Sequence, residues 1–438
     1  MKLRRTKVLL SGAFVLAALI APSTRANGDS AAPVSVPVIR TSPPAPVFDK
    51  QTRLAELASR RARVAEAIGP RGFLVMFSTE PRVYTNDVDY EYRQENNLYY
   101  LTNLKQNNAT LVLLPGNAEV PEILFMPRRD PGAETWTGHM YSAEEANDIS
   151  GVKEIWESSE FDPFIKAIRN RQPYRPKPEH ILLSTNTSAG VAITPYEKLF
   201  AAALKNEGEL YLLVPGDAES REYKREQRFA ADWIKSASGY SVKNITPVFD
   251  AMRLRKSPME IAFMQHAMDI TTEAHERSWI GAANAKWEYE VDALVAYTFK
   301  LRNADHWGYP SIVGCGPNAT TLHYEESQGP VTTGNLLLMD VGAEYEHYSA
   351  DVTRTFPVNG RFSTEQAAVY QIVYDAQEAA AKATRPGALI SDVHRAATEV
   401  IKNGLLKLGL ITDPNSSQYR IWFMHGTSHW LGMNVHDV

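Results

Sequence analysis

The sequence predicts a protein of the mixed α/β (α+β) class with two domains, and three observations carry this prediction. In residues 51–250, short apolar runs with strand character alternate with helical patterns. Ser257 and Pro258 then form a strong helix start, and residues 251–438 place long helical patterns around one strand hairpin. With 438 residues and 44% apolar composition, the chain is long enough for two full cores.

The N-terminus has the pattern of a secretory signal peptide over residues 1–26. A basic start is followed by an apolar run over residues 8–20, which is too short to cross a bilayer comfortably. We therefore expect cleavage after Ala26, no stable membrane insertion, and a periplasmic or secreted protein; an uncleaved anchor is the alternative. Arg4 and Arg5 leave open whether export uses the twin-arginine or the general route.

Composition bears on three features: the segment after the signal peptide, nucleic-acid binding and disulfide bonds. Residues 27–50 are rich in proline, alanine and serine, and this predicts a disordered tether. The formal net charge of -5 argues against nucleic-acid binding. Cys315 is the only cysteine, so an intrachain disulfide is impossible, and its two glycine neighbours favour a small packing residue over a nucleophile.

Helical and strand patterns follow one another in both halves of the chain. The first half predicts helices over 53–68, 142–150 and 161–169 and strands over 72–77, 97–101, 109–115, 122–126, 180–184 and 210–214. The second half predicts helices from Ser257 toward Trp279 and over 288–302, 364–381 and 390–408, with strand character within 309–327 and a hairpin over 336–356.

The hairpin carries one aspartate on each strand, Asp340 and Asp351. If the strands pair symmetrically about Tyr345 and Glu346, the two carboxylates lie opposite each other on one face, about 5 Å apart. Two such carboxylates repel each other unless one is protonated or a cation lies between them. The hairpin contains no lysine, and Arg354 points to the other face, so one or two divalent metal ions are the simplest explanation. The alternative is that one aspartate faces solvent or caps a turn.

Four histidines surround the hairpin in the sequence: His323, His425, His429 and His436. The spacing of His425 and His429 is that of a zinc-binding helix, but Gly426 replaces the glutamate of HExxH and argues against a helix. Each histidine alone is more often a surface or core residue than a ligand, yet three of them fall within twelve residues. Carboxylate and imidazole ligands without thiolate suit manganese, zinc, cobalt or iron in a hydrolytic site.

A resemblance to a known family is carried by three motifs in the second half: HYEES, MDVGAEYEHYSADVTRTFPVNGRFS and HGTSHWLGMNVHDV. They resemble the metallopeptidase family of Xaa-Pro aminopeptidase (aminopeptidase P) and prolidase, whose catalytic domain has the pita-bread fold. In the first half, NDVDYEYRQENNLYYLTNL and FMPRRDPGAETWTGHMYSAEEA resemble that family's N-terminal domain. The resemblance implies that residues 51–250 are an aminopeptidase P-type N-terminal domain and residues 251–438 the catalytic domain.

The resemblance also implies a metal-dependent reaction. Asp340 matches a ligand of one metal, Asp351 a ligand that bridges two metals, and His429 the only histidine ligand. The implied cofactors are two divalent metal ions, manganese first, with zinc or cobalt as alternatives. The implied activity is hydrolysis of the bond between an N-terminal residue and proline by a hydroxide that bridges the metals, and the partners are peptides with proline at the second position.

Four further residues acquire roles by resemblance alone. His323 and His436 match catalytic histidines that contact the scissile peptide, and His425 matches a histidine that lines the proline pocket. Trp136 matches a tryptophan that family oligomers lend to a neighbouring active site, so the resemblance implies a homo-oligomer.

The sequence departs from the family at its C-terminal end. The family's two glutamate ligands follow the last motif, and the sequence stops at Val438. The resemblance therefore implies a pita-bread domain that is incomplete at its C-terminus, either a fragment or a naturally short chain. Such a chain is expected to bind metal weakly and to hydrolyse Xaa-Pro peptides negligibly. Alternatives are a non-catalytic pita-bread binding protein, a prolidase restricted to Xaa-Pro dipeptides, or a metal-free amidinohydrolase similar to creatinase, which has no use for two aspartates.

Overall fold

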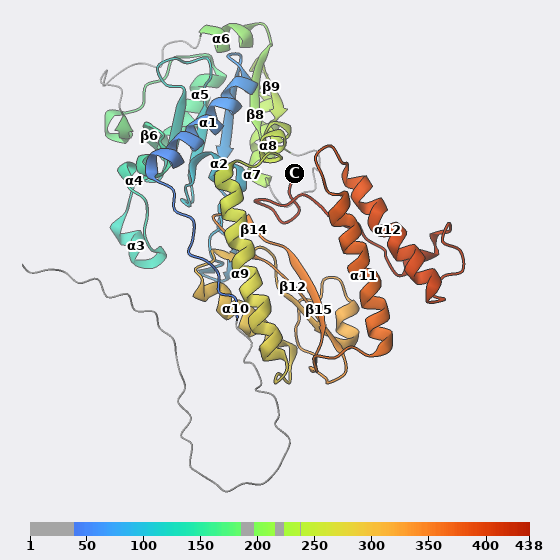
Figure 1. Cartoon of the computed structure of the whole chain (residues 1–438). Helices are drawn as coiled ribbons and strands as arrows, with labels where there is room; N and C mark the ends of the chain where they lie inside the picture. The colour runs from blue at the N-terminus through green and yellow to red at the C-terminus, as the bar shows by residue number, and fades with distance from the viewer. Residues whose placement is uncertain (1–38, 185–196, 215–222, 237) are drawn as a thin grey trace, which may run out of the picture. The chain divides into compact units, whose positions relative to one another are not determined.

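The computed structural model describes residues 39–184, 197–214, 223–236 and 238–438 (Figure 1). Residues 39–438 form one compact unit. The predicted signal peptide, residues 1–26, and the start of the predicted tether lie outside the described residues. Within the described ranges, no helix has the length and apolar character needed to span a bilayer.

The last part of the predicted tether is ordered, which corrects the expectation for residues 39–49. The backbone N–H of Arg40 donates to Glu276 at 2.5 Å, and that of Ser42 donates to Glu273 at 2.7 Å. Both acceptors lie on α9 (Pro258–Ala282). Two hydrogen bonds to carboxylates of a long helix fix this segment on the second half of the chain, which its composition did not reveal.

A seven-stranded mixed sheet organises the first half, in the order β7-β6-β5-β4-β1-β8-β9. Its strands are β1 (Gly72–Phe77), β4 (Thr110–Leu113), β5 (Glu122–Met126), β6 (Glu154–Glu157), β7 (Ile181–Ser184), β8 (Gly208–Leu212) and β9 (Tyr240–Asn244). The helices are α1 (Lys50–Ile68), α2 (Asn96–Thr102), α3 (Pro131–Thr137), α4 (Ala143–Ser150), α5 (Phe161–Arg169), α6 (Glu197–Leu204), α7 (Lys224–Lys235) and α8 (Thr246–Arg253), and β2 (Val83–Thr85) pairs with β3 (Val88–Asp89).

Both faces of this sheet are buried. On the central strand β1, Leu74 and Met76 belong to one apolar cluster, whereas Phe73, Val75 and Phe77 belong to a second. Helices α1 and α4 contribute to the first cluster, and α5 and α7 contribute to the second. Because successive side chains of a strand point to opposite faces, the sheet is the middle layer of an α/β arrangement, as the alternation of elements predicted.

One predicted strand in the first half is wrong. Residues 97–101 lie in the helix α2, not in a strand. The carboxylate of Glu95 accepts from the backbone N–H of Leu98 at 2.7 Å and caps the helix, and all seven helical residues are buried. A short helix that is buried on every side shows no polar face, so its apolar spacing resembles that of a buried strand.

The second half contains long helices around two small sheets. The helices are α9, α10 (Glu288–Leu301), α11 (Thr364–Ala383) and α12 (Ile390–Lys407). One sheet has the order β11 (Ile312–Cys315), β12 (Leu336–Val341), β15 (Val352–Pro357); the other has the order β10 (His306–Trp307), β13 (Ala343–Tyr345), β14 (Tyr348–Ser349). The predicted start of α9 is confirmed, since Ser257 and Glu260 form a reciprocal capping box with Pro258 in the first turn.

The predicted register of the hairpin is wrong by two residues. Asp340 lies opposite Thr353, and Asp351 lies just before β15 begins. The turn consists of Glu346 and His347, both with positive φ (51° and 65°), rather than of Tyr345 and Glu346. A shift of two residues leaves every side chain on its predicted face, so the two aspartates still lie on the same side of the sheet.

Gly342 divides the hairpin into its two sheets. A Cβ atom at this position would lie 1.9 Å from the carbonyl oxygen of Ala350, so only glycine permits this close approach of the strands. The strand β12 ends just before Gly342 and β13 begins just after it. The break directs the turn toward the first half of the chain, while Asp340 stays in the sheet of β11, β12 and β15.

Candidate active site

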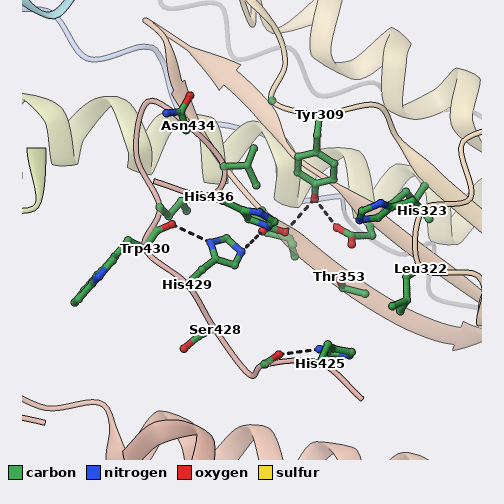
Figure 2. A pocket seen from close by; sticks show the side chains of 18 of the residues that line it. Tyr309, Leu322, His323, Thr353, His425, Ser428, His429, Trp430, Asn434 and His436 are labelled. Carbon is green, nitrogen blue, oxygen red and sulfur yellow. Dashed lines mark hydrogen bonds and ion pairs between the residues drawn. The ribbon is translucent and has the colours of Figure 1, made fainter. Parts of the chain in front are cut away.

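An open cleft of about 3640 Å³ contains the predicted site residues of the hairpin and the C-terminal segment. Alternate residues of β12, namely Leu336, Leu338 and Asp340, line the cleft, and the intervening residues are buried against α9 and α10. The alternation of a strand therefore places one carboxylate on the open face of a sheet whose other face is core. Tyr309, His323, Asp351, His429 and His436 line the same cleft (Figure 2).

The two aspartates meet at the hydroxyl group of Tyr309, which sequence reasoning missed. This hydroxyl lies 2.5 Å from Asp340 Oδ1 and 3.1 Å from Asp351 Oδ1 (Figure 2). Tyr309 lies in the bend between β10 and β11, and no local pattern singles it out. Burial and the two carboxylates raise the pKa of Tyr309 far above its usual value, so the hydroxyl group stays protonated. Its single hydrogen can form a hydrogen bond with one carboxylate at a time.

Burial raises the pKa of the Asp340 carboxyl. The hydrogen bond from Tyr309 lowers this pKa, the nearby charge of Asp351 raises it, and a hydrogen bond from Thr353 and the nearby His323 lower it. The two carboxylates therefore repel each other on one face of the sheet. A bound cation would relieve that repulsion, which is the physical condition that the sequence predicted from the hairpin.

The third predicted ligand, His429, lies against Asp351. Its Nδ1 lies 2.8 Å from the carbonyl oxygen of Trp430, and its Nε2 lies 3.0 Å from Asp351 Oδ2. In the tautomer that donates through Nδ1 to this carbonyl oxygen, Nε2 carries the lone pair that a metal ligand needs. Metal–ligand bonds of about 2.1 Å at right angles place two donor atoms about 3 Å apart. The distance and the donor types thus fit two ligands of one cation.

The donor atoms suit a metal ion in type and spacing, but the described residues do not form a complete set of ligands. Within the ranges that the structure describes, no three His, Cys, Asp or Glu side chains already form a group that could hold a metal ion. Tyr309 stands between Asp340 and Asp351, and of these two carboxylates Asp351 is the one that contacts His429. The described residues therefore supply candidate ligands in the right place without a preformed site.

The predicted second pair of histidines lies beside these candidates. The rings of His436 and His429 have centroids 4.3 Å apart. His323, in the loop before β12, is close enough to Asp340 to affect the pKa of that carboxyl. Both histidines are exposed and line the cleft, and in Figure 2 they lie on opposite sides of Tyr309. Their position suits contact with a bound molecule better than burial in the core.

The other two predicted site residues lie farther away. His425 lines the cleft, but its ring contacts Phe423 and its Nδ1 lies 2.7 Å from the carbonyl oxygen of Gly426. Trp136 lies on α3, is 89% exposed and does not line this cleft. The segment that carries the three C-terminal histidines contains no α-helix, as Gly426 predicted. A role of Trp136 in a neighbouring subunit stays a prediction.

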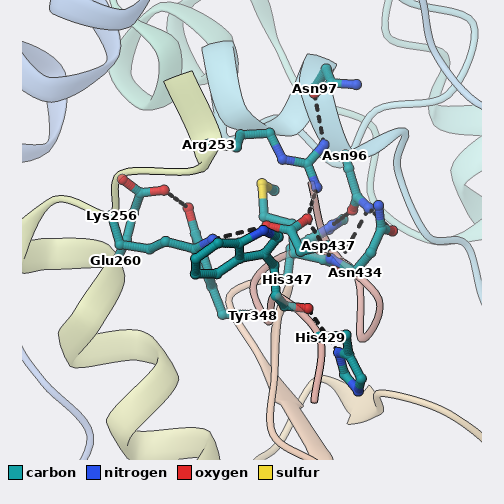
Figure 3. A network of polar contacts seen from close by, with 12 residues as sticks. Asn96, Asn97, Arg253, Lys256, Glu260, His347, Tyr348, His429, Asn434 and Asp437 are labelled. Carbon is teal, nitrogen blue, oxygen red and sulfur yellow. Dashed lines mark hydrogen bonds and ion pairs between the residues drawn. The ribbon is translucent and has the colours of Figure 1, made fainter. Parts of the chain in front are cut away.

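A buried ion cluster anchors the C-terminal segment and was not foreseen (Figure 3). The carboxylate of Asp437 accepts from Arg253 Nη2 at 2.5 Å and from Lys256 Nζ at 3.1 Å. Arg253 also donates to Asn97 Oδ1 at 2.8 Å. Because the backbone N–H of Asp437 and the ring of His429 share the carbonyl oxygen of Trp430, this cluster fixes the segment next to the metal candidates.

The fold is an α/β domain followed by helices around paired strands. Two carboxylates and one imidazole converge in its cleft, and these ligand types are typical of a metal-dependent hydrolase. The comparisons with known proteins agree. Residues 262–438 match the model of metallopeptidase family M24, and residues 57–175 match that of the aminopeptidase P N-terminal domain. The chain belongs to the aminopeptidase P family of metallopeptidases, with an N-terminal domain of that type before a pita-bread catalytic domain.

Individual relatives cover most of the chain. The Xaa-Pro aminopeptidases of Escherichia coli and Haemophilus influenzae are 33% and 32% identical to it, and each alignment covers 87% of this chain and 81% or 80% of the relative. Among solved structures, aminopeptidase PepP of Pseudomonas aeruginosa has a TM-score of 0.72 at 28% identity, with 89% of this chain and 81% of that chain covered. Zinc-substituted E. coli aminopeptidase P in complex with product has a TM-score of 0.70 at 27% identity, covering 89% and 82%.

Proposed function

We propose that this protein is a Xaa-Pro aminopeptidase, a metal-dependent exopeptidase that hydrolyses the bond between an N-terminal residue and proline. The observation that carries the proposal is the convergence of Asp340, Asp351 and His429 in one cleft of a chain from this family. Its substrates are peptides with proline at the second position. Two divalent metal ions are the proposed cofactors, manganese first, with zinc or cobalt as alternatives.

The chain's own residues divide into two sets. Asp340, Asp351 and His429 would hold the metal, which when bound supplies an activated water and stabilises negative charge on the carbonyl oxygen. His323 lies near Asp340 and His436 lies near His429, and we assign both to orienting the scissile peptide and holding a proton near its carbonyl or nitrogen. We assign His425 to the wall that contacts the proline ring, because it lines the same cleft at some distance from the carboxylates.

We further propose that the protein is exported by its N-terminal signal and acts as a homo-oligomer. The sequence predicted weak metal binding and negligible hydrolysis of Xaa-Pro peptides by the 438-residue chain. We propose weak metal binding together with slow, measurable hydrolysis, because Asp340, Asp351 and His429 still converge in the cleft. Weak binding is proposed because the described residues contain no preformed group of three ligands, and metal affinity depends strongly on the number of ligands. The same observation favours the second candidate, a non-catalytic pita-bread binding protein.

The test is a metal-dependent assay with paired peptides. Residues 27–438 are incubated with millimolar manganese and a fluorogenic Xaa-Pro tripeptide, the matched Xaa-Ala tripeptide, or an Xaa-Pro dipeptide. We expect slow, chelator-sensitive cleavage of the Xaa-Pro tripeptide only. Cleavage of the dipeptide alone would indicate a prolidase. No cleavage over long incubation, together with retained peptide binding, would favour the non-catalytic protein.

Exchange of His436 for alanine should separate the chemical step from metal binding. We expect His436→Ala to lower kcat by about 100-fold, the usual contribution of a proton-transfer group, and to leave manganese binding unchanged. The reason is that the ring of His436 meets that of His429 edge to face, and no hydrogen bond joins His436 to either carboxylate among the described residues. Steady-state kinetics and metal content by mass spectrometry measure both effects. His139→Ala, outside the cleft, is the control, and loss of metal from the His436 variant would contradict the assignment.

A further inference from the structure

A fully buried carboxylate lies at the root of the loop that carries His323. Glu288, the first residue of α10, is 0% exposed. Its Oε1 accepts from the backbone N–H of Cys315 at 2.6 Å, and its Oε2 accepts from the backbone N–H of Gly329 at 2.6 Å. The amide of Asn318 donates to both oxygens at 3.0 and 3.3 Å, and the hydroxyl group of Tyr324 donates to Oε2 at 2.8 Å.

These four donors mark the course of one loop. Cys315 ends β11, Asn318 lies in the turn after it, Tyr324 follows His323 directly, and Gly329 closes the loop. The carboxylate thus holds the loop at its start, in its middle and at its end. The residues between these points include His323, which is exposed to the cleft on the other side.

The packing around the carboxylate excludes other arrangements. A Cβ atom on Gly329 would lie 2.8 Å from both carboxylate oxygens and 2.3 Å from the amide nitrogen of Asn318, so the backbone approaches as closely as glycine allows. The backbone N–H of Glu288 in turn donates to the carbonyl oxygen of Gly329 at 2.9 Å. Because the carboxylate also lies at the N-terminus of α10, the helix dipole favours its negative charge.

We propose that Glu288 is a positioning residue: it holds the loop 316–329 so that His323 faces Asp340 in the cleft. The inference deepens the proposed function and rests on it for the role of His323. A buried carboxylate with four donors is stable only when all of them are in place, since a buried donor that loses its acceptor keeps the full cost of its desolvation. The loop therefore has one arrangement, and the ring of His323 is presented from a fixed base instead of a mobile one.

The first arm of the test measures the loop itself. Glu288→Gln replaces one acceptor oxygen by an amide that turns hydrogens toward donors, so we expect amide hydrogen exchange in residues 316–329 to rise about tenfold or more. Glu290→Gln is the matched control, because Glu290 lies in the same helical turn and, among the described residues, its side chain accepts one hydrogen bond, from the backbone N–H of Lys286 at 3.1 Å. Unchanged exchange in the Glu288 variant would overturn the proposal.

The second arm measures the coupling to His323. At saturating manganese, Glu288→Gln is expected to lower kcat by about 100-fold with little change in KM, since a misplaced group commonly costs that much. In the His323→Ala background the same substitution should have almost no further effect, because the group that it positions is gone. Additive losses in the double variant would show that Glu288 does not act through His323.

Two further readouts keep the outcome decisive. If Glu288→Gln does not fold, Tyr324→Phe removes one donor next to His323 and is expected to shift exchange and kcat in the same direction by a smaller factor. If the parent chain shows no hydrolysis, the proposed function fails, whereas the exchange arm still decides whether Glu288 holds the loop.

Discussion

Asp351→Asn is expected to weaken manganese binding by about 100-fold or more and to remove the hydrolysis of Xaa-Pro peptides. Asp351 is the one described side chain that contacts both other parts of the site, through Tyr309 on one side and His429 Nε2 on the other. An asparagine keeps the shape and one weak acceptor but loses the charge, and hard divalent cations depend on charged oxygen ligands. Calorimetric titration with manganese and metal content after dialysis measure the loss.

The control for this variant is the same substitution on an exposed helix. Asp375 on α11 is exposed, accepts one hydrogen bond from Gln371 and does not line the cleft. Asp375→Asn should therefore leave metal affinity and turnover unchanged. An Asp351→Asn chain that binds manganese as well as the parent would remove Asp351 from the ligand set, and with it the proposed metal centre.

The sequence predicted the face of the hairpin on which each side chain lies, but not the register in which the two strands pair. Glu346 and His347 both adopt positive φ, which local sequence rules assign to asparagine and glycine. Their conformation is stabilised from the first half of the chain: Glu346 accepts from Arg53 and Tyr99, and the ring of His347 stacks on Tyr99 at 3.8 Å. A turn fixed by residues some 250 positions away in the chain gives no local signal, so symmetry about the polar residues placed it one residue too early.

In the candidate site, too, the sequence singled out some residues and missed others. The sequence placed Asp340 and Asp351 on one face because two carboxylates on one hairpin are chemically unusual, whereas the family resemblance alone selected His429 among the four histidines. Their role as metal ligands stays a prediction. Tyr309 was not predictable, since a single tyrosine between short strands is ordinary in sequence and becomes informative only when both carboxylates lie within reach of its hydroxyl. Glu288 was foreseen as a helix start, and its burial against a distant loop was not.

The anchor of the C-terminal segment should dominate the stability of the second half. Asp437→Asn is expected to destabilise the protein by about 3–5 kcal/mol, because it leaves two cations without their partner in a nearly dry environment. The side chains of Arg253, Lys256 and Asp437 are only 4%, 12% and 1% exposed. The midpoint of unfolding in urea, followed by fluorescence, measures the change.

A matched control separates burial from charge. Glu207 pairs with Arg71 at 3.8 Å, with both side chains more than half exposed. Solvent screens such a pair, so Glu207→Gln should cost no more than about 1 kcal/mol. A similar loss in both variants would show that the Asp437 cluster contributes no more than a surface ion pair.

Asp437→Asn should also weaken metal binding at the candidate site. Asp437 follows His436, and its backbone shares the Trp430 carbonyl oxygen with the ring of His429. Once the anchor is lost, this segment is free to move, and we expect Asp437→Asn to weaken manganese binding under conditions where the protein is still folded. The double variant Arg253→Met with Asp437→Asn removes one stranded cation and should regain part of the stability, because a buried ion pair is often replaceable by apolar groups. Failure of the double variant to regain any stability would show that Arg253 is held by Asn97 alone, and that Asp437 is not the anchor of the segment.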